Sequence, residues 1–267
     1  MAKRPVDKGL GRGDNGSERM RILCTNDDGY LSPGIRVLAE AAHAIGSVDV
    51  VAPDRERSAS SNSLTLHRPL RKRRVPDGTT IVDGTPTDCV ILAVMEFGDR
   101  LPDLCVSGIN HGPNLGEDVL YSGTVAAAME ATILGIPSVA FSYVGHGIEE
   151  VEGWQAVVSR LLEQITAQGI PSHELLNVNL PAISPDEVQG VRVTNLGKRR
   201  YSDAITRAPD PSGREYYWIG GGYPHWNGGP HSDFRAVQEG YISVTPMHLD
   251  LTHYPRLDDV RRWNLQP

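Results

Sequence analysis

The chain has 267 residues, a formal net charge of −7 at pH 7 and 39% hydrophobic residues, which is ordinary for a soluble globular protein. The length fits one large α/β domain, or one domain with an appendage. The acidic balance gives no support to non-specific nucleic-acid binding, and no apolar run approaches the roughly 18 residues of a membrane-spanning helix. Neither nucleic acid nor a membrane is therefore expected as a partner.

The N-terminal residues and the cysteines indicate the cellular compartment in which the protein is expected. Residues 1–19 carry basic residues among glycines without an apolar segment, so they predict a disordered leader rather than a secretory signal. Met20, directly before the first predicted strand, is an alternative start. Cys24, Cys89 and Cys105 lie among apolar residues without a C-x-x-C spacing, as buried thiols do. This usage favours a reducing, cytoplasmic location.

An acidic loop separates the first predicted strand from the first predicted helix. Residues 22–24 form a short apolar run of buried-strand type. Asn26, Asp27 and Asp28 follow, and Ser32 is a good N-cap for the helix after them. The loop therefore lies at the carboxyl end of a strand, where open α/β sheets bind their ligands. Two adjacent carboxylates repel each other there, and a cation would relieve the repulsion.

Strands and helices then alternate with short connections. Strands are predicted at residues 47–53, 103–108, 138–142 and 176–180, and helices at residues 85–97, 122–134 and 154–168. This alternation predicts an α/β fold with a mostly parallel, doubly wound sheet. The basic run within residues 64–75 is predicted to be a solvated edge strand, with a polyanion site as the alternative.

The character of the sequence changes near residue 190. Short β segments at residues 191–194, 215–219 and 241–245 are separated by glycines, prolines and aromatic residues. We expect a β-rich extension of hairpins here, with a short terminal helix at residues 258–264. Exposed hairpins often pair with a second subunit, so oligomerisation is a reasonable hypothesis.

Three loops that follow strands carry oxygen-rich side chains, at residues 26–28, 58–61 and 110–114. In a parallel sheet these loops share one edge, so their oxygen atoms can converge on a hard cation such as Mg²⁺, Mn²⁺ or Ca²⁺. The helix start at residues 122–124 adds free N–H groups that suit a phosphate. Each of these features also has a purely structural interpretation: the acidic pair as a solvated turn, the serine-rich loop as a flexible loop and the helix start as a cap. His111 is more readily a loop residue than a general acid.

Several segments closely resemble the SurE family of survival proteins and 5′-nucleotidases. They are TNDDG (residues 25–29), VAPDR (51–55), GTPTDC (84–89), SGIN (107–110), GPNLG (112–116) and YSGTVAAAME (121–130). The resemblance runs from Met20 to about Trp263. It implies a Rossmann-like three-layer core over residues 20–189 and a swapped, β-hairpin-rich C-terminal extension over residues 190–267. It also implies assembly as a homodimer or homotetramer through that extension.

The resemblance further implies a metal-dependent phosphomonoesterase with one divalent ion, Mg²⁺ or Mn²⁺, per subunit. Nucleoside 5′-monophosphates are the expected substrates, and 3′-monophosphates and short polyphosphate are further candidates. A metal-dependent nucleotide-sugar glycosyltransferase and a non-catalytic nucleotide-binding regulator are the alternatives. The family's metal ligands fall on Asp27, Asp28, Ser58 and Asn110, the first two also being the expected catalytic residues. Its phosphate contacts fall on Asn26, Asn114, Ser122, Gly123 and Thr124. Ala59 stands where many members carry glycine.

Overall fold

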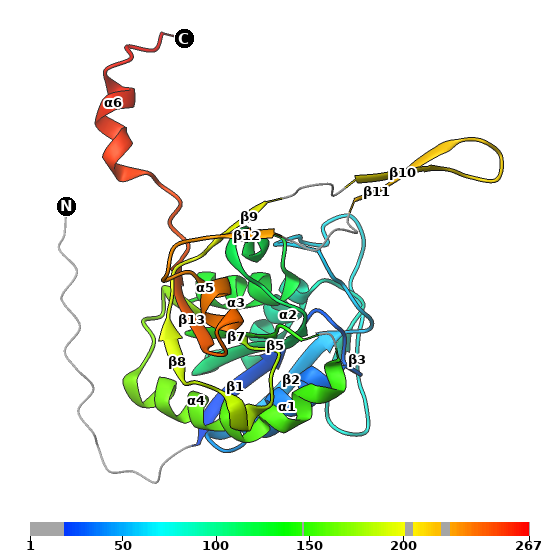
Figure 1. The fold of residues 1–267 in the computed structure, drawn as a ribbon. Helices are drawn as coiled ribbons and strands as arrows, with labels where there is room; N and C mark the ends of the chain where they lie inside the picture. The colour runs from blue at the N-terminus through cyan, green and yellow to red at the C-terminus, as the bar shows by residue number, and fades with distance from the viewer. Residues whose placement is uncertain (1–18, 146, 201–204, 220–224, 267) are drawn as a thin grey trace.

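The computed structural model describes residues 19–145, 147–200, 205–219 and 225–266, so all but the last residue of the predicted leader lies outside the described part. Nine strands form one sheet in the order β3-β4-β2-β1-β5-β6-β7-β13-β8 (Figure 1). Their bounds are β1 Met20–Thr25, β2 Gly46–Pro53, β3 Lys72–Arg74, β4 Thr80–Val82, β5 Leu104–His111, β6 Ser138–Tyr143, β7 Glu174–Leu180, β8 Val191–Val193 and β13 Ile242–His248.

The pairing confirms the predicted sheet. Strands β4, β2, β1, β5, β6 and β7 are parallel, whereas β3 and β13 run antiparallel to their neighbours β4 and β7. The chain moves from β1 to β2 on one side and later returns to place β5 on the other side of β1. The carboxyl ends of β1 and β5 therefore meet at a topological switch point, where open α/β sheets bind ligands.

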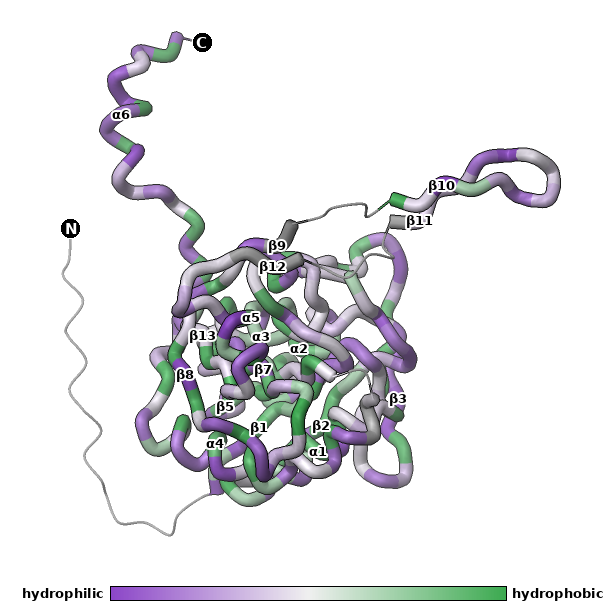
Figure 2. The backbone as a smooth tube through the Cα atoms, in the orientation of Figure 1, coloured by the Kyte–Doolittle hydropathy of each residue, from purple (hydrophilic) through white to green (hydrophobic). Residues whose placement is uncertain are grey.

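Helices cover both faces of the sheet and complete the expected three layers. The helices are α1 Pro33–Ala42, α2 Pro86–Phe97, α3 Gly123–Ile133, α4 Gln155–Gln168, α5 Asp233–Gln238 and α6 Leu257–Arg261, with short 3₁₀ turns η1 Gly116–Leu120, η2 Ile148–Trp154, η3 Pro185–Glu187 and η4 Tyr254–Arg256. One core joins α1 and α4 to the sheet, and another joins α2 and α3. Figure 2 shows hydrophobic residues gathered in the central strands. No helix in the described part of the chain is long and apolar enough to cross a membrane.

Local capping explains where the helices begin. Ser32 accepts a hydrogen bond from the N–H of Gly34 at 3.3 Å and starts α1. Thr85 and Asp88 form a reciprocal capping box at the start of α2. Ser122 accepts the N–H of Val125 at 3.0 Å and starts α3. These side chains satisfy N–H groups that have no partner inside a helix, so helix starts were predictable from sequence.

The C-terminal part does not form a separate layer. β8 and β13 continue the main sheet, so the change of pattern near residue 190 does not coincide with a break in it. Two antiparallel pairs lie outside the sheet, β9 (Lys198–Arg200) with β12 (His225–Asn227) and β10 (Ile205–Pro209) with β11 (Glu215–Ile219). The β10–β11 hairpin and α6 extend away from the core (Figure 1). The division into two domains stays a prediction.

Candidate active site

The acidic loop after β1 is buried and tightly closed. Asn26 is fully buried, and its amide donates to the carbonyl of Gly29 at 2.9 Å. Gly29 has φ +91°, and a Cβ at this position would lie 2.9 Å from the backbone carbonyl carbon of Arg55. Only glycine therefore allows the loop after β2 to pack onto the acidic loop. Asn26, a predicted phosphate contact, closes this turn.

Asp27 lies against the start of α3. It is 4% exposed, and the hydroxyl of Thr124 donates to its Oδ1. The same hydroxyl lies 3.3 Å from Oδ1 of Asn110, so Thr124 joins the two predicted metal ligands. A Cβ on Gly123 would lie 2.7 Å from Cβ of Asp27, so the helix approaches as closely as it does because that residue is glycine. The positive end of α3 therefore faces the Asp27 carboxylate.

Asp28 connects the acidic loop to the end of β5. Its Oδ2 accepts the backbone N–H of His111 at 3.0 Å. β5 continues through Asn110 to His111, three residues beyond the predicted strand end at residue 108, so Asn110 is held by a strand rather than a loop. The register of β5 against β6 shifts between Ser107 and Asn110. The amide of Asn110 then donates to the carbonyl of Gly112 at 2.8 Å, which fixes its side chain.

The protonation of the two carboxyls reflects the burial of negative charge. Burial, together with the charge of Asp28, raises the pKa of Asp27 to about 6, although the hydrogen bond from the Thr124 hydroxyl opposes the rise. Burial also raises the pKa of Asp28 above its ordinary value, and the N–H of His111 opposes this. A cation between them would reverse both effects because it favours the charged forms.

The donor atoms suit a hard divalent cation. Asp27, Asp28 and Asn110 offer carboxylate and amide oxygens, which Mg²⁺ and Mn²⁺ prefer. Among the described residues, no three His, Cys, Asp or Glu side chains gather as a metal-binding group. The candidate site therefore combines two acids with neutral oxygen donors.

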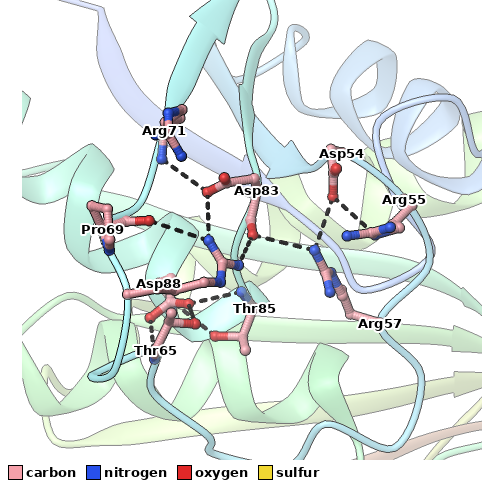
Figure 3. Close-up of polar contacts among 10 residues, drawn as sticks. Asp54, Arg55, Arg57, Thr65, Pro69, Arg71, Asp83, Thr85 and Asp88 are labelled. Atoms are coloured by element: carbon pink, nitrogen blue, oxygen red, sulfur yellow. Dashed lines mark hydrogen bonds and ion pairs between the residues drawn. The ribbon is translucent and has the colours of Figure 1, made fainter.

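The loop after β2 is tied to the acidic loop, although the Ser58 hydroxyl does not point toward it. The N–H of Arg57 donates to the carbonyl of Asp27 at 2.7 Å. The guanidinium of Arg57 contacts Oδ1 of Asp54 at 3.0 Å and the carbonyl of Asp83 at 3.2 Å (Figure 3). The exposed Ser58 donates to Oε1 of Glu56 at 2.6 Å. The structure thus brings together Asp27, Asp28 and Asn110 but leaves Ser58 bonded to Glu56.

Basic residues within residues 64–75 are bonded to an acidic residue of the same chain. Arg68 forms an ion pair with Oδ1 of Asp83 at 3.2 Å. The backbone N–H of Arg71 donates to the same oxygen at 2.8 Å (Figure 3). Lys72 begins the short strand β3 at the edge of the sheet. The edge-strand prediction is thus confirmed only for Lys72–Arg74, and the rest of residues 64–75 is not a strand.

Asn114, another predicted phosphate contact, belongs to a buried polar network with residues of β6 and β7. Its side-chain amide donates to the hydroxyl of Ser142 at 2.8 Å, and its backbone N–H donates to Oδ1 of Asn179 at 2.9 Å. Asn177 donates to the Asn114 carbonyl at 2.8 Å. Sequence reasoning missed Asn177 and Asn179. The available signal was their alternation with apolar residues in β7, which puts both on one face of a buried strand.

Asp233, also missed, fastens the loop that carries Asn114. This residue at the start of α5 is fully buried. Its Oδ2 accepts the N–H of Gly116 at 2.7 Å, and its Oδ1 accepts the N–H of Gly197 at 2.8 Å. Burial raises the pKa of the Asp233 carboxyl, while these N–H groups lower it. One carboxylate from the C-terminal part therefore holds two distant backbone segments.

We expect Asp233→Ala to destabilise the protein by about 2–4 kcal/mol, because two buried N–H groups lose a charged acceptor. The melting temperature should fall by roughly 5–10 °C. Asp233→Asn keeps one acceptor oxygen and should lose less. Thermal unfolding followed by circular dichroism measures both variants, and an unchanged melting temperature for Asp233→Ala would contradict the role.

The fold and site define an α/β protein with an acidic, oxygen-rich site and a helix N-terminus at the switch point of its sheet. The model of the survival protein SurE family matches residues 22–203. A 5′-nucleotidase SurE of Gemmatimonas aurantiaca is 54% identical over 252 residues, covering 93% of this chain and all of that protein. A 5′-nucleotidase SurE of Methylococcus capsulatus is 50% identical over 244 residues, covering 91% and 97%. The chain belongs to the SurE family.

A solved structure agrees with this assignment. The crystal structure of a SurE protein from Aquifex aeolicus is similar to this chain with a TM-score of 0.81 and 42% sequence identity. The structural match covers 92% of this chain and all of the Aquifex aeolicus chain. The similarity therefore includes the core and most of the C-terminal part.

Proposed function

We propose that the protein is a 5′-nucleotidase, which hydrolyses nucleoside 5′-monophosphates to a nucleoside and inorganic phosphate. The relatives that share about half of its residues carry the name 5′-nucleotidase SurE. The observation that carries the proposal is the contact of Asp27 with the start of α3. It puts acidic ligands and an anion-binding helix end in one place, which suits a phosphate monoester together with a cation.

One divalent cation per subunit, Mg²⁺ or Mn²⁺, is part of this proposal. Asp27, Asp28 and Asn110 would hold it, and Ser58 is the fourth ligand that the family resemblance assigns. The fit rests on the donor atoms and on two buried carboxyls whose raised pKa values a positive charge would lower. When bound, such a cation polarises a phosphoryl oxygen and acidifies a bound water.

The chain's own residues would position the reactants and stabilise charge. Asp27 and Asp28 would orient the attacking water, and one of the two carboxylates would accept its proton. Thr124 holds the carboxylate of Asp27 near Asn110. The N-terminus of α3 at Gly123 faces the charge that grows on the phosphate oxygens, where preorganised N–H groups are most effective.

Two further expectations accompany the activity. Oligomers through the C-terminal part are supported by the projecting β10–β11 hairpin, on which Tyr217 and Trp218 are 56% and 66% exposed. Sedimentation velocity of the intact chain should give a dimer or tetramer, and a clean monomer would contradict this. A cytoplasmic location is supported by three buried free cysteines, which fit a reducing compartment.

The activity test measures phosphate release from nucleoside 5′- and 3′-monophosphates and short polyphosphate. We expect release from 5′-monophosphates that EDTA stops and that added Mg²⁺ or Mn²⁺ restores. Release that EDTA leaves unchanged would contradict the cation requirement. No release with any cation would contradict the nucleotidase, and nucleotide binding without turnover would favour the regulator.

A further inference from the structure

The loop after β2 carries two hydroxyl groups in opposite surroundings. Ser58 is exposed and its hydroxyl is already bonded to Glu56. The Oγ of Ser60 is buried, and within the described part of the chain it has no hydrogen-bond partner. Buried hydroxyl groups are nearly always hydrogen-bonded, so the Ser60 hydroxyl requires an explanation.

Ser60 faces the candidate site. A Cβ built on Gly123 would lie 2.8 Å from Oγ of Ser60 and 2.9 Å from Oδ2 of Asp27. The hydroxyl, the carboxylate and the first turn of α3 therefore meet around one point. The three come from different parts of the chain, and the absence of a side chain on Gly123 lets them approach one another this closely.

The position of Ser60 is fixed by anchors on both sides. On one side, the N–H of Arg57 donates to the carbonyl of Asp27 at 2.7 Å. On the other side, the N–H of Ser61 donates to the carbonyl of Tyr121 at 3.1 Å, and its hydroxyl donates to the carbonyl of Leu120 at 2.7 Å. Ser61 and Ala59 both have positive φ, +51° and +56°. The loop thus spans from the acidic loop to the start of α3 and holds Ser60 between them.

The neighbouring hydroxyl groups are already engaged. The hydroxyl of Thr124 donates to Asp27, and that of Ser122 caps α3 by accepting the N–H of Val125. Ser60 therefore differs from both because its hydroxyl neither donates nor accepts a hydrogen bond among the described residues. A phosphate at this helix end would bring acceptor oxygens to a donor that lacks one.

We propose that Ser60 is a substrate-binding residue, whose hydroxyl donates a hydrogen bond to an oxygen of a phosphate group bound at the start of α3. This inference rests on the proposed function, because it takes the phosphate group of that substrate as the ligand. The two serines of the loop then have different roles: the family resemblance assigns Ser58 to the cation, and this proposal assigns Ser60 to the phosphate.

The test compares Ser60→Ala with the wild type and with Ser63→Ala, an exposed serine of the same loop. Inorganic phosphate is titrated into each protein by calorimetry with excess Mn²⁺ present, and Mn²⁺ is titrated alone. Ser60→Ala should weaken phosphate binding by about tenfold or more, as expected for a hydrogen bond to a charged group. Mn²⁺ binding should stay within about twofold, and Ser63→Ala should resemble the wild type.

A stability measurement separates this role from a structural one. Because the hydroxyl has no partner in the protein, Ser60→Ala should melt no lower than the wild type without phosphate. Added phosphate should raise its melting temperature less than that of the wild type. A lower melting temperature without phosphate would indicate a structural role and overturn the proposal.

The remaining outcomes are distinct. Unchanged phosphate binding in Ser60→Ala would overturn the inference even if the wild type is an active nucleotidase. Weaker Mn²⁺ binding with unchanged phosphate binding would make Ser60 a cation ligand and overturn it as well. A wild type without nucleotidase activity whose phosphate binding depends on Ser60 would overturn the proposed function but support the inference.

Discussion

Asp27→Asn is expected to lower nucleotidase activity by at least about a thousandfold, because a lost cation ligand removes several kcal/mol of transition-state stabilisation. The fold should persist. The amide oxygen of asparagine can still accept the hydroxyl of Thr124, and the side chain keeps its size. Phosphate release from a nucleoside 5′-monophosphate with added Mn²⁺ measures the loss. Turnover close to that of the wild type would contradict the assignment of Asp27 to the cation.

The same variant should be more stable than the wild type when no cation is present. The folded pKa of Asp27 is about 6 against an ordinary value of 3.8, so the folded protein favours the protonated acid. Between these values the folded state holds a proton that the unfolded chain has lost, and stability falls as the pH rises through that interval. Above it, the difference in pKa corresponds to about 3 kcal/mol at most. Asparagine carries no charge and avoids most of this penalty.

Thermal unfolding in EDTA tests whether Asp27→Asn raises or lowers the stability of the cation-free protein. Asp27→Asn should melt higher than the wild type at pH 8, and the advantage should shrink at pH 5. Added Mn²⁺ should stabilise the wild type and leave the variant unchanged, since ligands that bind only the folded state raise its stability. A variant that melts below the wild type at pH 8 would contradict the burial of an unfavourable charge.

Asp28→Asn should also lose activity while keeping its contact with His111.

Gly123→Ala is expected to lower activity by about a hundredfold, since displacements near 1 Å at a reacting centre have effects of that size. The new Cβ would lie 2.7 Å from Cβ of Asp27 and 2.8 Å from Oγ of Ser60, so α3 or the acidic loop must move. Stability should fall by about 1–3 kcal/mol, partly offset by the better helix propensity of alanine.

Gly229→Ala is the matched control for this variant. A Cβ there meets nothing within 4 Å, and its φ is not in the left-handed region. It should keep wild-type activity and stability. The comparison uses phosphate release at saturating substrate together with thermal unfolding. A fully active Gly123→Ala would show that the close approach of α3 to Asp27 is not needed.

The sequence by itself determined the parts of this protein that depend on neighbouring residues. The caps at Ser32, Thr85 and Ser122 bind N–H groups within three residues, so their helix starts could be predicted closely. Alternating strands and helices predicted the parallel sheet, and the rule for strand ends predicted that the segments of Asp27 and Asn110 lie at one edge of it, where their oxygen atoms can converge. The family resemblance added the assignment of individual ligands, which spacing alone does not supply.

Only the tertiary structure decided which oxygen atoms face the site and what holds them. β5 runs on to His111 because it pairs with β6 beyond a register shift, and β13 joins the main sheet because it pairs with β7. Asp233 binds the N–H of Gly116, 117 residues away, and no local pattern signals this contact. Ser58 and Ser60 look alike in sequence, yet one is exposed and the other has a buried hydroxyl. These features depend on partners distant in the chain, and such partners are set by packing rather than by local hydrogen bonding.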